Sequence, residues 1–435
     1  MSGPRAYGGA GHGRIAPVTD QDRTVNGEAS HGKRVTWAEL YFDLVFVFAV
    51  GQVAHAIVEE PSWRRVGESL GVFAPLWWTW IGFAVLYNRQ GDDERPGDRL
   101  VQLAGTIPCA IAATQAHHVF EGHPATFALA LAGARLVLAG AYAFAAHGVR
   151  EVRGIGWGYA LSVALFGISA VIPAPWCYVL WGSTLLQEGG FLLLGERREQ
   201  ARAVPGEPRE RKGRAEVLRE RFAPPRNPHQ AVDADHLAER FGLFMIILLG
   251  ELVITAGDAA LDPSAQNAGY WLSLVGGLVL AGALWWIYFT SAAEIDKQLL
   301  TVSGGNPTLA YSLYAGGHLA PAFALLLTAA GVNLSLHEHP PHTAPWFIAT
   351  GLTIYLARMR IFSSVSRRRY AAPLRILAIV ATANLGLLGR VLSAPAIVAV
   401  AAAWAVAGAV IATRSRDGAL ERLQVDPAAF VRGRA

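Results

Sequence analysis

Long apolar runs, separated by short clusters of charged residues, are the feature of this sequence that most restricts its fold. Of the 435 residues, 53% are hydrophobic and 16% are charged, whereas a soluble protein usually carries about 25% charged residues. A hydrocarbon core about 30 Å thick is crossed by about 20 helical residues, because each residue adds about 1.5 Å. The runs therefore predict an all-α polytopic membrane protein with about twelve transmembrane helices.

The expected spans can be placed between charged loops. They cover residues 37–58, 69–88, 100–118, 125–147, 156–172, 176–194, 237–257, 270–291, 308–333, 345–362, 374–391 and 394–413. Lys and Arg gather in alternate loops, most densely in 195–226, with Arg64 and Arg65 as the main exception. Because cytoplasmic loops carry the excess of basic residues, we predict a multi-pass membrane protein with both termini in the cytoplasm.

Short segments of the first half of the chain recur in the same order in the second half. Residues 38–41 (AELY) match 238–241 (AERF), 51–53 (GQV) match 250–252 (GEL), and 76–78 match 284–286 (both LWW). This order predicts two parallel six-helix repeats related by an axis along the membrane normal. Chance similarity between apolar helices is the alternative interpretation.

The expected domain organisation has five parts. They are a flexible N-terminal tail (1–35), a first six-helix membrane repeat (36–194), a basic cytoplasmic linker (195–236), a second six-helix membrane repeat (237–413) and a cytoplasmic tail (414–435). The linker contains Pro and charges of both signs, a composition typical of a segment that connects domains rather than of a nucleic-acid surface.

Two carboxylates near the start of the first span are candidate functional residues. Glu39 and Asp43 lie four residues apart and therefore share one face of a helix. A charged side chain in the membrane costs about 2.5 kcal/mol or more unless it has a partner or faces water. We predict either a proton or cation site, or a carboxylate pair that is bound to a basic partner and fixes helix packing.

Further polar residues fall inside or at the ends of the expected spans. Glu251 lies deep in the seventh span, while Glu239 and Arg240 mark its start, where Arg240 is expected to be an interfacial anchor. Arg135 lies near the middle of the fourth span and is the expected counter-ion for the acids, or part of a structural ion pair. His318 is an expected intramembrane residue that either packs or transfers protons.

Pairs of tryptophans occupy the second and eighth spans. They are Trp77, Trp78, Trp285 and Trp286. Core packing is one interpretation, and an aromatic-walled cavity for an apolar or cationic ligand is the other.

Two loops on the same expected outer side are rich in histidine. The first has His117, His118, Glu121 and His123, and the second has His337, Glu338, His339 and His342. Their spacing matches no closed zinc site, so we predict solvated loops, no metal and no cofactor.

Three segments resemble the bacterial low temperature requirement protein A (LtrA) family. The first is 37–49 (WAELYFDLVFVFA), the second has Arg89 with Asp92 and Asp93, and the third carries His236, Glu239, Arg240, Gly242, Leu243, Phe244, Leu249, Gly250 and Glu251. The resemblance extends from about residue 34 to 412, and it implies comparable residues at Arg135 and His318. It also implies that the protein lies in the bacterial inner membrane. Thr290 stands where the family commonly has Asp, so Glu294 or Asp296 would have to supply any carboxylate needed there.

These observations favour a transporter or a proton- or cation-coupled translocator with buried acids. An intramembrane enzyme that acts on a lipid or isoprenoid, with acids that protonate an apolar substrate, is the first alternative. A non-catalytic scaffold or stress-response protein is the second. The expected partners are the lipid bilayer and a small molecule or ion, without nucleic acid, and the sequence is compatible with a homo-oligomer.

Overall fold

The computed structural model describes residues 3, 33–91, 95–145, 150–202, 222–225, 231–258, 267–358 and 371–425. The chain divides into the units Met1–Lys33 and Arg34–Ala435, and the fold is that of the second unit. The expected tail 1–35 lies mostly outside the described residues, as does much of the expected linker.

The described part of the second unit consists of helices and turns, without a strand. The helices are α1 (Trp37–Glu59), α2 (Trp63–Gln90), α3 (Pro96–Phe120), α4 (Ala125–Ala145), α5 (Arg150–Ser169), α6 (Trp176–Arg202), α8 (Ala234–Asp258), α9 (Ala268–Ile287), η5 (Tyr288–Ala292), α10 (Ala293–Val302), α11 (Pro307–Ala310), η6 (Tyr311–Ala315), α12 (Gly316–Leu334), α13 (Ala344–Arg358), α14 (Ala371–Ala383), α15 (Leu385–Leu388) and α16 (Ala394–Val425). The all-helical prediction is confirmed, and the described residues of each expected span lie largely within one of these helices or within a run of consecutive ones.

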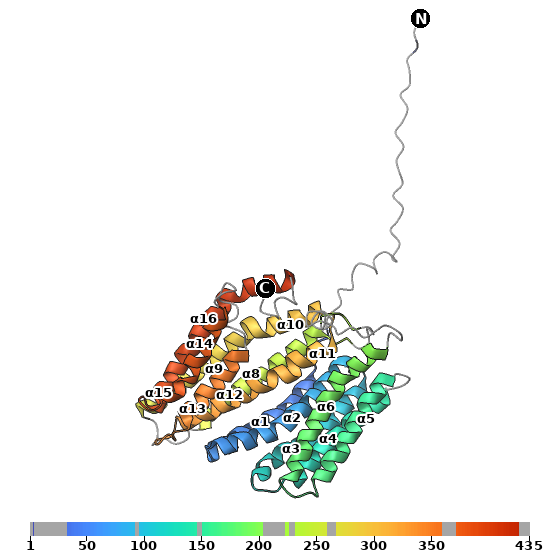
Figure 1. Ribbon diagram of the computed structural model, residues 1–435, viewed down its shortest axis with the longest axis horizontal. Helices are drawn as coiled ribbons and strands as arrows, with labels where there is room; N and C mark the ends of the chain where they lie inside the picture. Colours follow the sequence, from blue (N-terminus) through green and yellow to red (C-terminus); the bar gives the residue numbers. More distant parts are fainter. Residues whose placement is uncertain are drawn as a thin grey trace. The chain divides into compact units, whose positions relative to one another are not determined.

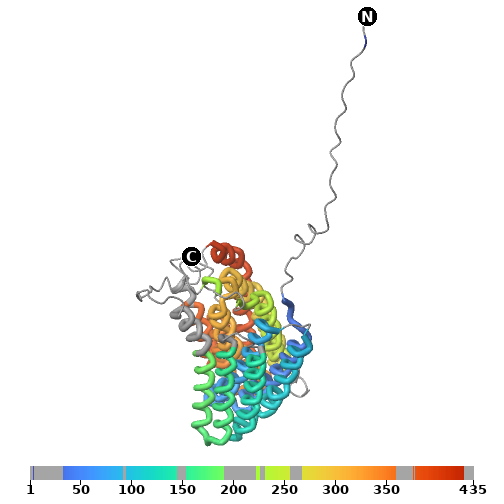
Figure 2. The backbone as a smooth tube through the Cα atoms, turned by 90° about the vertical axis from the view of Figure 1, so that its right-hand side faces the viewer, coloured from blue at the N-terminus to red at the C-terminus, as the bar shows by residue number. Residues whose placement is uncertain are grey.

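Six of the described helical segments are long and apolar enough to cross a membrane. They are Trp37–Glu59, Trp63–Gln90, Ala125–Phe144, Ala268–Val302, Pro307–Leu334 and Ala394–Val425. The total of twelve spans therefore stays a prediction. The start of α1 and the end of α16 lie at the same end of the bundle, which fits an even number of crossings (Figure 2).

Local sequence signals explain several helix boundaries. Helix α1 begins with a capping box, in which the Thr36 side chain accepts a hydrogen bond from the Glu39 N–H and the Glu39 carboxylate accepts one from the Thr36 N–H. Asn267 and Asn306 cap α9 and α11 through their side chains alone, which accept hydrogen bonds from the backbone N–H groups of Tyr270 and Leu309. These caps satisfy N–H groups that a helix start leaves without partners.

Two π-helical turns interrupt long helices of the second half. η5 lies between α9 and α10, and η6 lies between α11 and α12. A π turn displaces the regular backbone hydrogen bonds and is frequent at functional sites. Here the Ala315 carbonyl of η6 accepts a hydrogen bond from the indole N–H of Trp77 of α2 at 2.9 Å.

The two halves of the chain meet along α1, α2, α8 and α12 (Figure 1). Glu39 pairs with Arg240 near the starts of α1 and α8, and a Cβ placed on Gly51 would lie 3.6 Å from the Glu251 carboxylate further along. Helices α1 and α8 therefore run side by side in the same direction. This contact brings together the two segments, 38–41 and 238–241, that match each other in sequence.

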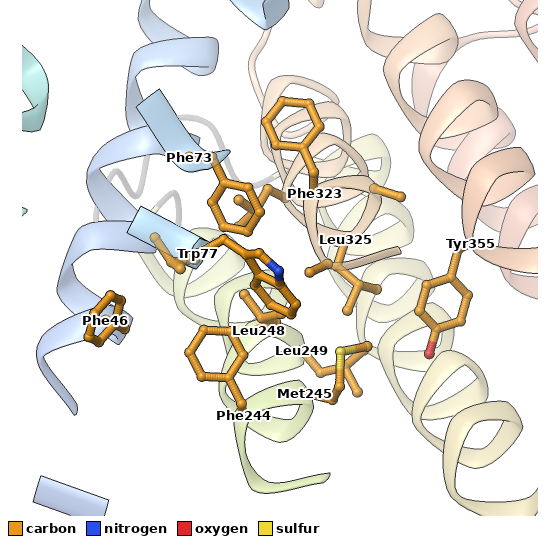
Figure 3. Close-up of a cluster of buried hydrophobic side chains, with 14 of the residues drawn as sticks. Phe46, Phe73, Trp77, Phe244, Met245, Leu248, Leu249, Phe323, Leu325 and Tyr355 are labelled. Carbon is orange, nitrogen blue, oxygen red and sulfur yellow. The ribbon is translucent and has the colours of Figure 1, made fainter. Parts of the chain in front are cut away.

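An aromatic and aliphatic core fills the space between these helices (Figure 3). Trp77 of α2 lies between Phe73 of its own helix and Phe244 of α8, with ring centroids 6.0 and 5.6 Å away. Phe323 of α12 packs 5.7 Å from Phe73. The core thus contains side chains from both halves, and the two halves share one hydrophobic cluster.

Close packing of α12 on α13 gives a first prediction. A Cβ at Gly351 of α13 would lie 2.6 Å from the Ala324 carbonyl oxygen of α12. Because a backbone atom cannot move aside cheaply, Gly351→Ala is expected to destabilise the protein by about 1–3 kcal/mol. Gly282→Ala on α9 is the matched control, since a Cβ there meets nothing within 4 Å. Thermal unfolding in detergent checks this, and equal melting temperatures for both variants would contradict it.

Candidate functional site

Five buried side chains from three helices form an acid–arginine cluster. They are Glu39 and Asp43 of α1, Trp80 of α2, and His236 and Arg240 of α8. Glu39, Asp43, His236 and Arg240 are each 0% exposed. The four-residue spacing of the two acids puts both on the face of α1 that packs against α8.

Arg240 is the cation that joins the two acids. Its guanidinium donates through Nη1 to Glu39 Oε1 and through Nη2 to Asp43 Oδ1, the latter at 3.1 Å. The indole N–H of Trp80 donates to the same Asp43 oxygen at 2.7 Å. The expectation of an interfacial Arg240 is therefore wrong. Helix α8 begins at Ala234, so Arg240 lies nearly two turns inside it and faces the acids.

The protonation state of His236 follows from its neighbours. The side-chain amide of Asn88 is oriented by the backbone of Asp233, because Asn88 Oδ1 accepts from the Asp233 N–H at 3.1 Å and Nδ2 donates to the Asp233 carbonyl at 2.9 Å. Nδ2 also lies 3.0 Å from His236 Nδ1, which must then be an acceptor. His236 is thus neutral and donates its Nε2–H to Glu39 Oε2, 3.1 Å away.

The cluster contains more acid than base. With His236 neutral, one guanidinium faces two carboxylates. Asp43 Oδ2 is buried and has no hydrogen-bond partner among the described residues. A buried carboxylate oxygen without a donor costs free energy unless it gains a proton or a cation. The cluster therefore contains an oxygen that is able to receive a positive charge.

Arg135 belongs to a second, balanced ion pair instead of the first cluster. It lies on α4 and binds Glu188 of α6 through Nε at 3.1 Å and Nη2 at 3.3 Å. Its Nη1 donates to Thr79 of α2, and its guanidinium stacks 4.6 Å from the Phe166 ring. The interpretation as a counter-ion of Glu39 or Asp43 is wrong, and the alternative of a structural ion pair agrees with this geometry.

Glu251 and Glu239 occupy different environments on α8. Glu251 is buried and its carboxylate lies against Gly51 of α1, so the small residue permits the close approach of the two helices. Glu239 is exposed and accepts a hydrogen bond from the Val35 N–H at 3.4 Å. Glu239 thus ties the segment before α1 to α8, outside the buried cluster.

His318 is buried between the two π turns. Its Nδ1 donates to the Leu313 carbonyl at 2.9 Å, and its Nε2 lies 3.1 Å from the Tyr288 hydroxyl. Its ring stacks on Tyr314 with centroids 5.4 Å apart and contacts Phe241 at 5.1 Å. Phe241 follows Arg240 in sequence, so one aromatic side chain separates His318 from the acid–arginine cluster.

A carboxylate lies close to this histidine, although Thr290 replaces the expected one. Asp296 is buried on α10 and pairs with Arg358 of α13 at 3.4 Å. Arg358 also donates to the carbonyls of Gly317 and Leu313, at 2.7 and 3.1 Å. Asp296 is thus bound to a cation that secures the π turn η6.

The four tryptophans do not line one cavity wall. Trp77 is buried, and Trp78 packs near Gly189 of α6. Trp285 and Trp286 are 41% and 47% exposed, and Trp286 donates to Thr413 of α16 at 2.8 Å. The aromatic-cavity interpretation is therefore corrected: Trp77 belongs to the core and Trp286 to the outer surface of the bundle.

Two histidines of the expected loop lie in the last turn of α3, where their side chains contact Glu121 at the surface. Glu121 lies 2.8 Å from His118 and 3.8 Å from His117. The hydrogen bond from His118, together with the nearby imidazoles, lowers the pKa of Glu121. Within the described ranges, no three His, Cys, Asp or Glu side chains are arranged to hold a metal ion.

Several residues of these centres were missed as site residues, among them His236, Arg358, Glu188, Asn88 and Trp80. Glu188 is a charged residue within an expected span, so the rule that selected Glu251 would also have selected it. Asn88 and Trp80 carry no charge, and their roles depend on partners 145 and 37 residues away in sequence. Asp92 and Asp93, which contribute to the family resemblance, lie outside the described residues.

Apolar helices that enclose ionic centres define a polytopic membrane protein. The family model described as bacterial low temperature requirement A protein (LtrA) matches residues 34–412, and the chain belongs to this family. The chain is also similar to an uncharacterized protein of Rhizobium meliloti (strain 1021), with 26% identity over 349 residues that make up 77% of this chain and 78% of that protein. No solved structure matches.

Proposed function

We propose that the protein is an ion-coupled transporter in which Asp43 takes up and releases the coupling proton or cation. The observation that carries this proposal is the buried Asp43 Oδ2, which has no described partner in a cluster with two acids and one guanidinium. A membrane protein that binds a charge at such a group can alternate between charged and neutral states. Each state favours a different arrangement of the surrounding helices.

The packing of the two halves supports this proposal. In the first half α1 packs on α2 and α3, α3 on α4, and α4 on α5, while in the second half α8 packs on α9 and α12, α12 on α13, and α13 on α14. This common order fits two parallel repeats of a transporter fold. Asp43 lies at their junction, since Arg240 of the other half binds it. The end of the bundle that carries the start of α1 faces the cytoplasm in this proposal.

Flux measurements on reconstituted protein test the proposal. Proteoliposomes are given a gradient of protons, Na⁺ or K⁺, and entrapped indicator dyes report ion movement. Wild-type protein is expected to dissipate at least one gradient, and Asp43→Asn is expected to abolish that flux because the amide cannot accept a proton or neutralise a cation. Asp417→Asn, on an exposed position of α16, is the matched control and is expected to keep wild-type flux.

Two outcomes contradict the proposal. One is wild-type protein that is folded and inserted but moves none of the three ions. The other is Asp43→Asn protein whose flux equals that of the wild type.

A further inference from the structure

We infer that the ion exchanged at Asp43 is a proton, which Asp43 Oδ2 holds as a neutral carboxyl group. This inference rests on the proposed function and names its coupling ion. It follows from the charge balance of the acid–arginine cluster, from the occupation of its oxygens, and from the lack of a metal-binding group of side chains in the described ranges.

The charge balance requires one further positive charge. Asn88 orients its Nδ2 toward His236 Nδ1, which keeps the imidazole neutral. Glu39 and Asp43 together then carry one negative charge more than Arg240 neutralises. An isolated charge inside a membrane protein costs several kcal/mol, so a neutral cluster is favoured. Addition of a single proton makes the cluster neutral.

The available oxygens distinguish the two acids. Glu39 accepts hydrogen bonds from Arg240, from His236 and from the Thr36 N–H, and both of its oxygens are used. Asp43 accepts hydrogen bonds from Trp80 and Arg240 on Oδ1 alone, and Oδ2 has no hydrogen-bond partner among the described residues. The proton therefore binds Asp43 Oδ2, while Glu39 remains the fixed carboxylate of the cluster.

A metal ion fits this position poorly. Hard cations such as Mg²⁺ and Ca²⁺ require about six or more oxygen ligands, and no group of metal-binding side chains occurs within the described ranges. A proton needs only one oxygen and no coordination shell.

The exchange step is a simple proton transfer. On uptake, an O–H bond forms between Asp43 Oδ2 and a proton delivered by water, and the carboxylate becomes neutral. On release, that bond breaks and the proton returns to water.

Asp43 and its partners are surrounded by few charged or titratable groups in the described part of the chain. They are Glu39 on the same helix as Asp43, and Arg240 and His236 on α8, while α2 contributes the neutral Trp80. The attraction between Arg240 and Asp43 weakens on uptake, which loosens one contact between the halves.

Infrared difference spectroscopy on the full-length protein tests the inference directly. The C=O stretching band of a protonated carboxyl is followed as the pH is changed, in H₂O and in D₂O. The band is expected in wild-type protein and in the control Asp417→Asn, and it is expected to be lost in Asp43→Asn. In Trp80→Phe the band should persist to higher pH, because the ionised carboxylate has lost a hydrogen-bond donor.

The flux assay separates failure of this inference from failure of the transporter proposal. Flux that requires Na⁺ or K⁺ and leaves the proton gradient intact overturns the proton inference and retains a transporter. An Asp43-dependent carboxyl band without flux of any ion supports the proton site and overturns transport. Absence of any carboxyl band that depends on Asp43 overturns the inference in every case.

Discussion

Replacing Arg240 by methionine is expected to cause a large loss of stability. The substitution leaves Glu39 and Asp43 buried without their cation, and removal of one partner from a buried ion pair costs about 3–5 kcal/mol. A lower yield of monodisperse protein and a much lower melting temperature should follow. Thermal unfolding in detergent, monitored by tryptophan fluorescence, measures the effect. Arg153→Met at an exposed position is the control for the loss of an arginine.

A rescue variant shows whether charge is the cause. Combining Arg240→Met with Glu39→Gln and Asp43→Asn removes every formal charge from the cluster, because His236 is neutral in the observed hydrogen-bond network. This variant should recover a large part of the lost stability, although it cannot transport protons. If Arg240→Met melts at the wild-type temperature, the cluster does not have the energetic role assigned to it.

Replacing Glu188 by leucine is expected to have an effect of similar size at a different place. Arg135 is 0% exposed, and without Glu188 the partners of its guanidinium among the described residues are Thr79 and the ring of Phe166. The cost is again about 3–5 kcal/mol, because the remaining charge stays buried. The melting temperature of Glu188→Leu, compared with that of Glu421→Leu at an exposed position, measures it.

A double-mutant cycle completes this experiment. Arg135→Met combined with Glu188→Leu replaces both charges by apolar side chains and should be markedly more stable than Glu188→Leu alone. Strictly additive effects of the two substitutions would show that the pair does not act as a unit. Proton flux, if present in the wild type, should survive in the double variant, because this pair lies outside the acid–arginine cluster.

The helical architecture could be predicted from the sequence because hydropathy reports the length and the apolar composition of each helical segment. The described residues of each expected span lie largely on helices, and the two acids of α1 were correctly assigned to one face. Their partner was not identified, because the spacing of residues along one helix gives no information about a helix 200 positions later. Arg240 was assigned to the membrane interface because the start of α8 was expected at residue 237 instead of 234.

The direction that an apolar residue faces was the least predictable property. Lipid tails are as apolar as a protein core, so hydropathy does not distinguish Trp77, which is buried, from Trp286, which is half-exposed. The π turns were also unexpected. No residue type requires a π turn, and here side chains of other helices, Trp77 and Arg358, bind the carbonyls of η6.

Trp77 and Trp80 lie one turn apart on α2, yet their indole N–H groups bond to different halves of the chain. Trp80 is bonded to Asp43 of α1, and Trp77 is bonded to the Ala315 carbonyl of the second half. Contacts of different chemistry therefore connect the halves, among them the ion pairs of Arg240 and the neutral hydrogen bond to the Ala315 carbonyl. Protonation of Asp43 would weaken its ion pair with Arg240 and leave the hydrogen bond between Trp77 and the Ala315 carbonyl intact. Separation of the two halves would therefore also require this neutral hydrogen bond at the π turn to break.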